Sequence, residues 1–251
     1  MECKQITIII QARSGSTRLP GKMTMPFYDG KSILEIIIGD LMDNCEFKIV
    51  LATTDSYKDD HLVELAHKTG IDVFRGSEDD VLERFINAAQ FYNAEYIVRV
   101  CGDNPFLSIF LMKELFKLYK GEDYLSFRYD NGKPTILGHL GMFCEFTNIH
   151  ALRKAAELTV DKLYREHVTN FLYGNPKVFN VKLVDLPESV HNYEGIRLTV
   201  DTKNDFVNSA KLYAQFGSMI EEADIQKLID YIQLNTVLLQ SMQSEIKMNT
   251  K

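Results

Sequence analysis

The chain has 251 residues with a formal net charge of −7, and 45% of them are hydrophobic. This length and apolar fraction fit one α/β domain with a sizeable core. The acidic balance argues against a nucleic-acid-binding protein, and no apolar run approaches the length of a signal peptide or a membrane span. Cys3, Cys45, Cys101 and Cys144 lie far apart without metal-binding spacing, which favours a reducing, cytoplasmic location. We expect Cys101 and Cys144 to be buried thiols.

The first predicted element is a strand over residues 6–10, Ile-Thr-Ile-Ile-Ile, buried on both faces. The loop that follows carries Arg13, Arg18 and Lys22 among glycines and other small residues. Glycines let backbone N–H groups approach phosphate oxygens while arginine and lysine neutralise them, so this loop predicts a polyphosphate site. Its glycines lack the Walker A spacing and no G-x-G-x-x-G is present, which disfavours a kinase or an NAD enzyme.

Helices and strands alternate through the rest of the first half. Helices are predicted at about residues 33–44, 59–68, 79–92 and 109–120, and strands at residues 47–52, 71–75 and 95–100. Ser32 and Ser108 are the expected N-caps, and Gly70 is the expected C′ residue of the second helix. The alternation predicts an α/β fold with a doubly wound, mostly parallel, Rossmann-like sheet, whose ligands lie outside the carboxyl ends of the strands.

The second half is less regular. It is predicted to contain strands at residues 141–146, 177–186 and 196–200, the middle one an edge or antiparallel strand, and helices at residues 148–158, 161–173, 205–216 and from 223 onward. The last helix carries an apolar stripe that we expect to face the core: Ile225, Leu228, Ile229, Ile232 and Leu239. We predict one domain over residues 1–251, with a nucleotide-binding half at about 1–120 and an acceptor-binding half at about 121–251, the latter with a smaller antiparallel element.

Four polar residues fall at the carboxyl ends of predicted strands, where ligands of such sheets bind: Arg13, Thr53, Arg75 and Asp103. Asp103 is a candidate Mg²⁺ ligand, because Mg²⁺ usually takes one or two protein carboxylates. The alternative is that Gly-Asp-Asn-Pro at 102–105 is simply a turn. Arg75 could contact a nucleotide, cap a helix, or pair with Asp79 or Asp80.

The loop at residues 11–22, Gln-Ala-Arg-Ser-Gly-Ser-Thr-Arg-Leu-Pro-Gly-Lys, resembles the nucleotide loop of the CMP-sugar-acid synthetases, and especially that of the spore-coat polysaccharide cytidylyltransferases. The resemblance extends from about residue 6 to about residue 205. It implies a Mg²⁺-dependent enzyme that transfers CMP from CTP to a sugar acid or a phosphorylated small acceptor for surface polysaccharide biosynthesis. It also implies that the loop binds the nucleotide through Gln11, Ala12, Arg13, Ser14, Gly15, Arg18 and Lys22, with Arg13 and Lys22 also catalytic.

Three further segments carry the resemblance. Phe-Arg-Gly-Ser at 74–77 is similar to a step near the cytosine, which implies that Arg75 and Ser77 bind the nucleotide. The segments at 99–105 and 197–202 are similar to those that supply metal carboxylates, which implies Asp103, also catalytic, and Asp201 as Mg²⁺ ligands. Thr199 stands where sialic-acid-activating relatives have the first Asp of D-x-D, so the number of Mg²⁺ ions is left open.

Tyr-Arg-Glu-His-Val-Thr at 164–169 is similar to a stretch of the spore-coat relatives, and Glu145 falls where those relatives also carry a Glu. The resemblance implies an acceptor site with these members: Glu145, Arg165, Glu166 and His167. The alternative is a charged surface helix. At the level of function, two rivals remain: a nucleotide-sugar glycosyltransferase, which can share this sheet topology, and a catalytically idle nucleotide-binding regulator. Pyrophosphate release separates the cytidylyltransferase from both. The expected partners are CTP and an anionic small molecule, with no nucleic acid and no membrane. The acceptor and the oligomeric state stay open, a homodimer included.

Overall fold

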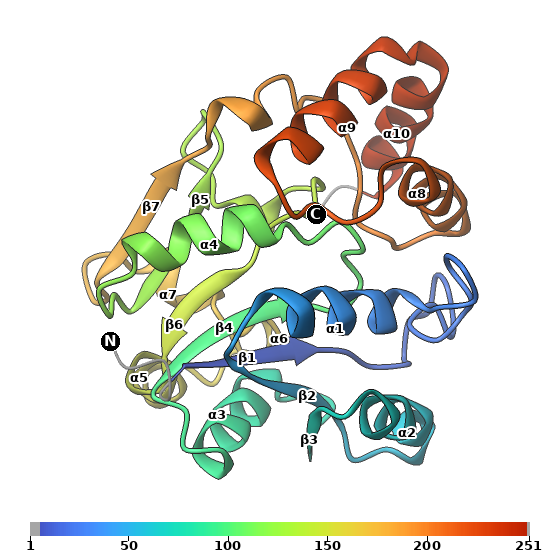
Figure 1. Cartoon of the computed structure of the whole chain (residues 1–251). Coiled ribbons are helices and arrows are strands. Elements are labelled where there is room, and N and C mark those ends of the chain that lie inside the picture. The colour runs from blue at the N-terminus through green and yellow to red at the C-terminus, as the bar shows by residue number, and fades with distance from the viewer. Residues whose placement is uncertain (1–5, 250–251) are drawn as a thin grey trace.

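A seven-stranded sheet organises the computed structural model, which describes residues 6–249 (Figure 1). Its strands, in spatial order, are β3 (Asp72–Gly76), β2 (Lys48–Thr54), β1 (Ile6–Gln11), β4 (Tyr96–Cys101), β6 (Glu145–Asn148), β5 (Tyr124–Arg128) and β7 (Val181–Asp185). β6 is antiparallel to both of its neighbours, and the other four pairings are parallel. The predicted α/β fold with a mostly parallel sheet is confirmed, and β6 is the antiparallel element of the second half.

Helices cover both faces of the sheet (Figure 1). On one face, α1 (Ile33–Asn44), α2 (Asp60–Thr69) and α4 (Ile109–Leu118) form a core with Ile8 and Ile10 of β1. On the other face, α3 (Val81–Phe91), α5 (Ile149–Leu158) and α7 (Asn170–Gly174) form a core with Ile9. Because successive side chains of a strand point to opposite faces, the apolar run of β1 supplies both cores.

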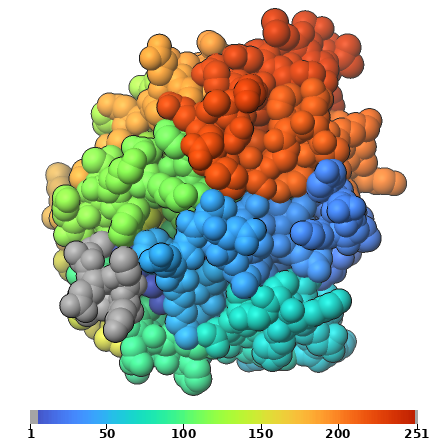
Figure 2. All heavy atoms as spheres, in the orientation of Figure 1, coloured from blue at the N-terminus to red at the C-terminus, as the bar shows by residue number. Residues whose placement is uncertain are grey.

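The C-terminal helices extend the first core past the edge of the sheet. α8 (Lys203–Phe216), α9 (Glu222–Leu234) and α10 (Thr236–Met248) lie along the segments of α1 and α4, as Figure 2 shows in orange to red. The predicted apolar stripe is confirmed, since its four residues on α9 are fully buried and Leu239 is partly buried against the core. The single helix predicted from residue 223 onward is wrong, because Asn235 ends α9 and its side chain accepts from the Leu238 N–H to cap α10.

The strand predicted over residues 196–200 is absent. The N–H groups of Leu198 and Thr199 donate to His139 O and that of Val200 to Asp103 O, but no neighbouring strand runs beside this segment. Its apolar side chains are buried, which produced the strand-like pattern. The segment is therefore a buried connection without a ladder.

Two other elements of the second half differ from prediction, and β5 was not predicted at all. The helix expected over residues 161–173 is divided into α6 (Lys162–Glu166) and α7, because the backbone of His167 leaves the helical region, at φ −104 and ψ 83. The strand expected over residues 141–146 begins only at Glu145, since Gly141 has φ +64. β7 is an edge strand as expected, but it is parallel to β5.

The predicted helix ends are confirmed. Ser32 forms a capping box with Glu35, Ser108 accepts from the Leu111 N–H, and Gly70 ends α2 at φ 84. Short 3₁₀ helices, η2 (Tyr57–Asp59), η3 (Thr135–Leu137) and η4 (Glu188–Val190), occupy connections. Within residues 6–249, no helix has both the length and the apolar character that crossing a membrane requires.

The cysteine predictions are confirmed in part. Cys144 is buried, whereas Cys101 is partly exposed at the end of β4, and Cys3 lies outside the described residues. Burial raises the pKa of the Cys144 thiol well above its usual range. Cys45 is partly buried, and its pKa is raised to about 11, also chiefly by burial.

Candidate active site

A cavity of about 650 Å³ opens at the carboxyl ends of β1 and β4. Part of its wall is the loop after β1, through Gln11, Ala12, Arg13, Gly15, Ser16, Thr17, Arg18 and Lys22. Another part is the region of α6 and α7, through Leu163, His167, Thr169, Asn170 and Tyr173. Arg99, Cys101 and Asp103 come from β4 and the loop after it. Both halves of the chain therefore build one cavity.

Lys22 is the centre of a buried charge cluster in this cavity. Its Nζ lies 2.8 Å from Asp103 Oδ2 and 3.6 Å from Asp201 Oδ1, and it donates to the Val200 carbonyl. Burial alone would lower the pKa of Lys22, but Asp103 and Asp201 outweigh it and raise that pKa above its usual value. Lys22 is thus a permanently charged group between two carboxylates that are far apart in the sequence.

Asp201 is held by further cations. Arg18 Nη2 lies 3.1 Å from Oδ1 of Asp201, and Arg197 Nη2 donates to Oδ2 at 2.9 Å. The Arg197 side chain is fully buried and also makes two bonds to Asp205, at 2.8 and 2.9 Å. Burial alone would lower the pKa of Arg197, but Asp205 and Asp201 raise it. These ion pairs fix the segment at 196–202, which has no strand ladder of its own.

Asp103 and Asp201 are the two carboxylates predicted to hold Mg²⁺, and the structure brings both to Lys22 Nζ. Mg²⁺ takes one or two protein carboxylates and completes its octahedron with water and phosphate oxygens, so this pair fits the ion. Asp103 is the more available ligand, because its side chain is 35% exposed and its ion pair is with Lys22, whereas Asp201 is 13% exposed and both of its oxygens face cations. The same described range contains no cluster of three or more histidine, cysteine or acidic side chains suited to a metal, so the nucleotide would have to supply further ligands.

Asp59 anchors the start of the loop at residues 11–22, which we call the phosphate loop after its predicted ligand. Its carboxylate accepts from the Ser14 N–H at 2.8 Å and from the hydroxyls of Thr53 and Thr54 at 3.0 and 2.6 Å. Burial would raise the pKa of Asp59, but the hydrogen bonds from Thr54, Ser14 and Thr53 prevail and lower it. Thr53 was predicted to bind the nucleotide, but it is fully buried behind the loop and does not line the cavity. Ser14 also lies outside the lining, with its hydroxyl 3.0 Å from His61 Nε2.

Arg75 was expected near the base. It pairs with Asp60 at 2.7 Å and donates to the carbonyls of Thr54 and Ser56, at 2.9 and 2.7 Å. Arg75 therefore ties β3 to the start of α2 and is absent from the cavity lining. Of the alternatives, the ion pair is the one observed, although the partner is Asp60 instead of residue 79 or 80.

Ser77 also lies outside the lining, where its hydroxyl accepts from the Asp80 N–H. Its carbonyl accepts from Nη1 of Arg84 at 2.7 Å, a buried α3 residue that the sequence analysis did not single out. The Nε and Nη2 atoms of Arg84 are buried and have no hydrogen-bond partner in the described part of the chain. Burial, with the charge of Arg13, lowers the pKa of Arg84 to about 10.

Glu145 acts behind the cavity wall. It is 1% exposed, and its oxygens accept from Arg99 Nη1, the Tyr124 hydroxyl and the Thr169 hydroxyl, the last two at 2.7 Å. Arg99 also donates to Gln11 Oε1 from Nε and Nη2, at 3.2 and 2.9 Å, and lines the cavity. The sequence analysis assigned no role to Arg99. A single charge within the apolar strand Tyr-Ile-Val-Arg-Val-Cys was the signal that could have identified it.

The predicted acceptor residues of the segment at 164–169 separate in space. His167 lines the cavity. Glu166 lies 3.6 Å from Arg13, which is also 4.0 Å from Glu78. Arg165 pairs with Asp80 of the loop before α3 at 2.8 Å and is not part of the lining.

The chain is similar to known proteins in both sequence and structure. Residues 7–244 match the family model described as cytidylyltransferase. An uncharacterised protein of Methanocaldococcus jannaschii is 41% identical over 231 residues, 90% of each chain. The spore coat polysaccharide biosynthesis protein SpsF of Bacillus subtilis is 33% identical over 220 residues, 84% of this chain and 88% of that protein. A solved cytidylyltransferase from Leptospira borgpetersenii serovar Hardjo-bovis, 30% identical, superposes with a TM-score of 0.78 over 94% of this chain and 97% of that one.

Proposed function

The chain belongs to the cytidylyltransferase family, and from that premise we propose that it transfers CMP from CTP to a hydroxyl of a sugar acid, with Mg²⁺ and release of pyrophosphate. It is a CTP-dependent nucleotidyltransferase, so the two rival hypotheses, a glycosyltransferase and a catalytically idle regulator, lose their support. The likeness to SpsF supports a role in making a surface polysaccharide.

The observation that carries the proposal is the cluster of Lys22, Asp103 and Asp201 in a cavity built by both halves of the chain. In the reaction, the acceptor oxygen bonds to the α-phosphorus of CTP while the bond from that phosphorus to the pyrophosphate oxygen breaks. Lys22 and the nearby Arg18 would neutralise the charge that moves onto the leaving pyrophosphate. Asp103, with Asp201, would hold Mg²⁺, which neutralises phosphate oxygens when bound.

The acceptor would lie on the side of the cavity formed by β4 and by α6 with α7. An anionic acceptor needs a fixed cation there, and Arg99 lines that side. Three of the five N–H donors of Arg99 are used by Gln11 and Glu145, which leaves two for a carboxylate. We therefore assign to Arg99 the binding of the acceptor's anionic group, a role that was expected of Arg165. His167, in the same lining, would take the proton from the acceptor hydroxyl.

The test is a pyrophosphate-release assay of the four NTPs with 3-deoxy-manno-octulosonate, N-acetylneuraminate and phosphorylated polyols, with and without Mg²⁺. CTP with a sugar acid should be the productive pair. Lys22→Ala should lower kcat by roughly 10²–10³, the range for removing one preorganised charge. Lys31→Ala is the control and should match the wild type, because Lys31 is exposed and does not line the cavity. Turnover that ignores the identity of the NTP, or a Lys22→Ala enzyme as active as the control, would refute the assignment.

A further inference from the structure

The C-terminal end of α10 reaches the phosphate loop. Nη1 of Arg18 donates to Oδ1 of Asn249 at 2.8 Å, and Nη2 of the same guanidinium lies 3.1 Å from Oδ1 of Asp201. Asn249 is the C-cap of α10, and it lies beyond residue 244, where the match to the cytidylyltransferase family model ends. A helix outside the matched range therefore contacts a cation of the proposed site.

The side chain of Asn249 is fixed by the end of its own helix. Its Nδ2 donates to the backbone carbonyl of Glu245 at 3.0 Å and to Oε2 of Glu245 at 3.2 Å. Its backbone N–H donates to the carbonyls of Glu245 and Ile246. Because the amide nitrogen is bound to Glu245, the amide oxygen is the atom that faces Arg18, which can only donate.

Glu245 connects this helix end to the segment that carries Asp201. Glu245 is 5% exposed, and its Oε1 accepts from Nδ2 of Asn204 at 2.8 Å. Its Oε2 accepts from the hydroxyl of Thr202 at 3.3 Å, and Thr202 is the N-cap of α8, directly after Asp201. One buried carboxylate thus joins Asn249 to the start of α8, so both contacts of the guanidinium belong to a single hydrogen-bonded unit.

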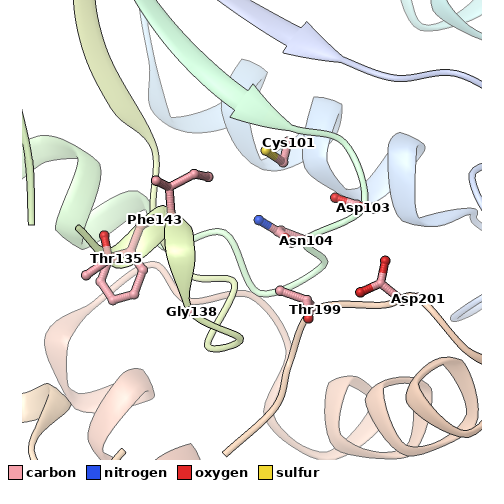
Figure 3. A pocket seen from close by; sticks show the side chains of 9 residues that line it. Cys101, Asp103, Asn104, Thr135, Gly138, Phe143, Thr199 and Asp201 are labelled. Carbon is pink, nitrogen blue, oxygen red and sulfur yellow. The ribbon is translucent and has the colours of Figure 1, made fainter. Parts of the chain in front are cut away.

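The place where this unit holds Arg18 is next to the proposed Mg²⁺ ligands. Asp201 lies on the segment that leads to α8, and its carboxylate is directed towards the loop that carries Asp103 (Figure 3). Lys22 Nζ lies 2.8 Å from Asp103 and 3.6 Å from Asp201. A guanidinium held at Asp201 therefore stands beside the charge cluster that carries the proposed reaction.

The ion pair with Asp201 is a weak hold for Arg18 by itself. The Arg18 side chain is 49% exposed and lines the large cavity. Exposed ion pairs fix a long side chain poorly, because water competes for both charges and the side chain loses freedom. Stabilisation of a transition state depends on charges that are in place before the reaction. A second contact from Asn249 restricts the guanidinium to the side of the cavity where it is needed.

An asparagine is suited to this task because its amide orients Arg18 without neutralising it. A carboxylate at the same position would offset part of the guanidinium charge, whereas the amide oxygen is an uncharged acceptor. The contacts with Asp201 and Asn249 use two of the five N–H donors of Arg18. Among the contacts within residues 6–249, three donors thus remain for phosphate oxygens.

We propose that Asn249 is a positioning residue that holds Arg18 beside Asp201 for the leaving pyrophosphate, which makes the end of α10 part of the active site. The inference rests on the proposed function and extends its site beyond the residues that the family model matches. Asn249 acts only through the guanidinium of Arg18.

A double-mutant cycle of Asn249→Ala and Arg18→Ala tests this dependence. Asn249→Ala alone should lower kcat with CTP by roughly 3- to 10-fold, as expected for one hydrogen bond, and leave the KM for the acceptor within about twofold. In the Arg18→Ala background the same substitution should change kcat by less than about twofold, because the residue through which it acts is gone. An equal loss in both backgrounds, or no loss in the wild type, would overturn the inference.

Asn44→Ala is the matched control. Asn44 is the last residue of α1, and its Nδ2 donates to the carbonyl of Asp40 at 2.9 Å, as Nδ2 of Asn249 does to the carbonyl four residues earlier. Asn44 does not line the large cavity. Asn44→Ala should therefore keep the kcat of the wild type, and a loss equal to that of Asn249→Ala would show that any weakened helix end has this effect and would overturn the inference.

Calorimetric titration of the same variants with inorganic pyrophosphate and Mg²⁺ separates the two levels of inference. Asn249→Ala should raise the Kd for pyrophosphate by roughly 3- to 10-fold when Arg18 is present, and by less than about twofold in Arg18→Ala. This coupling without turnover of any sugar acid would refute the proposed reaction and leave Asn249 assigned. Turnover without coupling in either assay would refute the role of Asn249 alone. A wild-type protein that neither turns over nor binds pyrophosphate would refute both.

Discussion

Replacing Glu145 with glutamine should lower the free energy of unfolding of the chain, because it breaks a buried ion pair behind the cavity wall. Glu145 is 1% exposed and balances Arg99, whose side chain is 7% exposed. The substitution keeps the shape but leaves Arg99 as a buried charge without a carboxylate, and it turns an NH₂ donor towards hydroxyls that now donate to Glu145. Breaking a buried pair in this way costs about 3–5 kcal/mol. For a chain of this size, roughly 2–4 °C per kcal/mol converts the lower figure into a fall in Tm of about 6–12 °C.

Urea denaturation followed by circular dichroism measures the free energy of unfolding directly. The matched control is Glu166→Gln, which removes a half-exposed ion pair at 3.6 Å from Arg13 and should lower that free energy by less than about 1 kcal/mol. In the remaining folded protein, Glu145→Gln should also raise the KM for the acceptor, because Arg99 loses its orientation. If Glu145→Gln were as stable as Glu166→Gln, the Arg99–Glu145 pair would not hold this part of the fold together.

Three further predictions follow from other residues. Asp103→Asn should lower Mg²⁺-dependent pyrophosphate release by at least about 10²-fold, because a neutral amide is a poor ligand for a hard cation; full activity would favour the simple turn at 102–105. The folded pKa of Asp59 lies below its unfolded value, so its stabilisation is complete above about pH 4 and is lost as the pH falls through the folded pKa. In calorimetry the wild-type Tm should therefore fall more steeply below about pH 4 than that of Asp59→Asn, and parallel curves would contradict this. Gly141→Ala should lower the free energy of unfolding, measured in urea, by about 1–3 kcal/mol. The loss should be larger than for Gly132→Ala, because Gly132 also has a positive φ but a Cβ added there would meet open space. Equal losses would show that crowding between the Cβ added at residue 141 and Thr199 is unimportant.

The first half of the fold could be predicted from sequence because local signals and packing agree there. β1, β2 and β4 are largely apolar runs, and Ser32, Gly70 and Ser108 mark helix ends with residues whose geometry is specific. The second half could not be predicted as well, because burial there does not coincide with regular structure. Ile196, Leu198 and Val200 are apolar and buried, but their segment is held by the ion pairs of Arg197 and by isolated backbone bonds, which leave no trace in a periodic pattern.

The candidate site could be predicted where sequence motifs carry it. Lys22, Asp103 and Asp201 meet as the motifs suggested. Other placements depend on side-chain direction, which sequence does not reveal: Arg75 turns to Asp60, and Arg165 turns to Asp80. Thr135 and Thr199 lie in two separate connections, and only the three-dimensional structure shows that their buried hydroxyls make no hydrogen bond within residues 6–249.

The same long-range pairs that build the cavity also determine when it can exist during folding. Lys22 bonds to Val200 across 178 positions of the chain, and Arg18 bonds to Asn249 across 231. Contacts of such separation pay a large loop-closure entropy and form late, so β1 to β4 can pair before the phosphate loop is fixed. During synthesis, a ribosome-bound chain that has completed β4 would hold the strands of the nucleotide half but not a seated Lys22. The final position of Lys22 is thus coupled to the docking of the segment at 196–202, which Arg197 ties to Asp205 of α8.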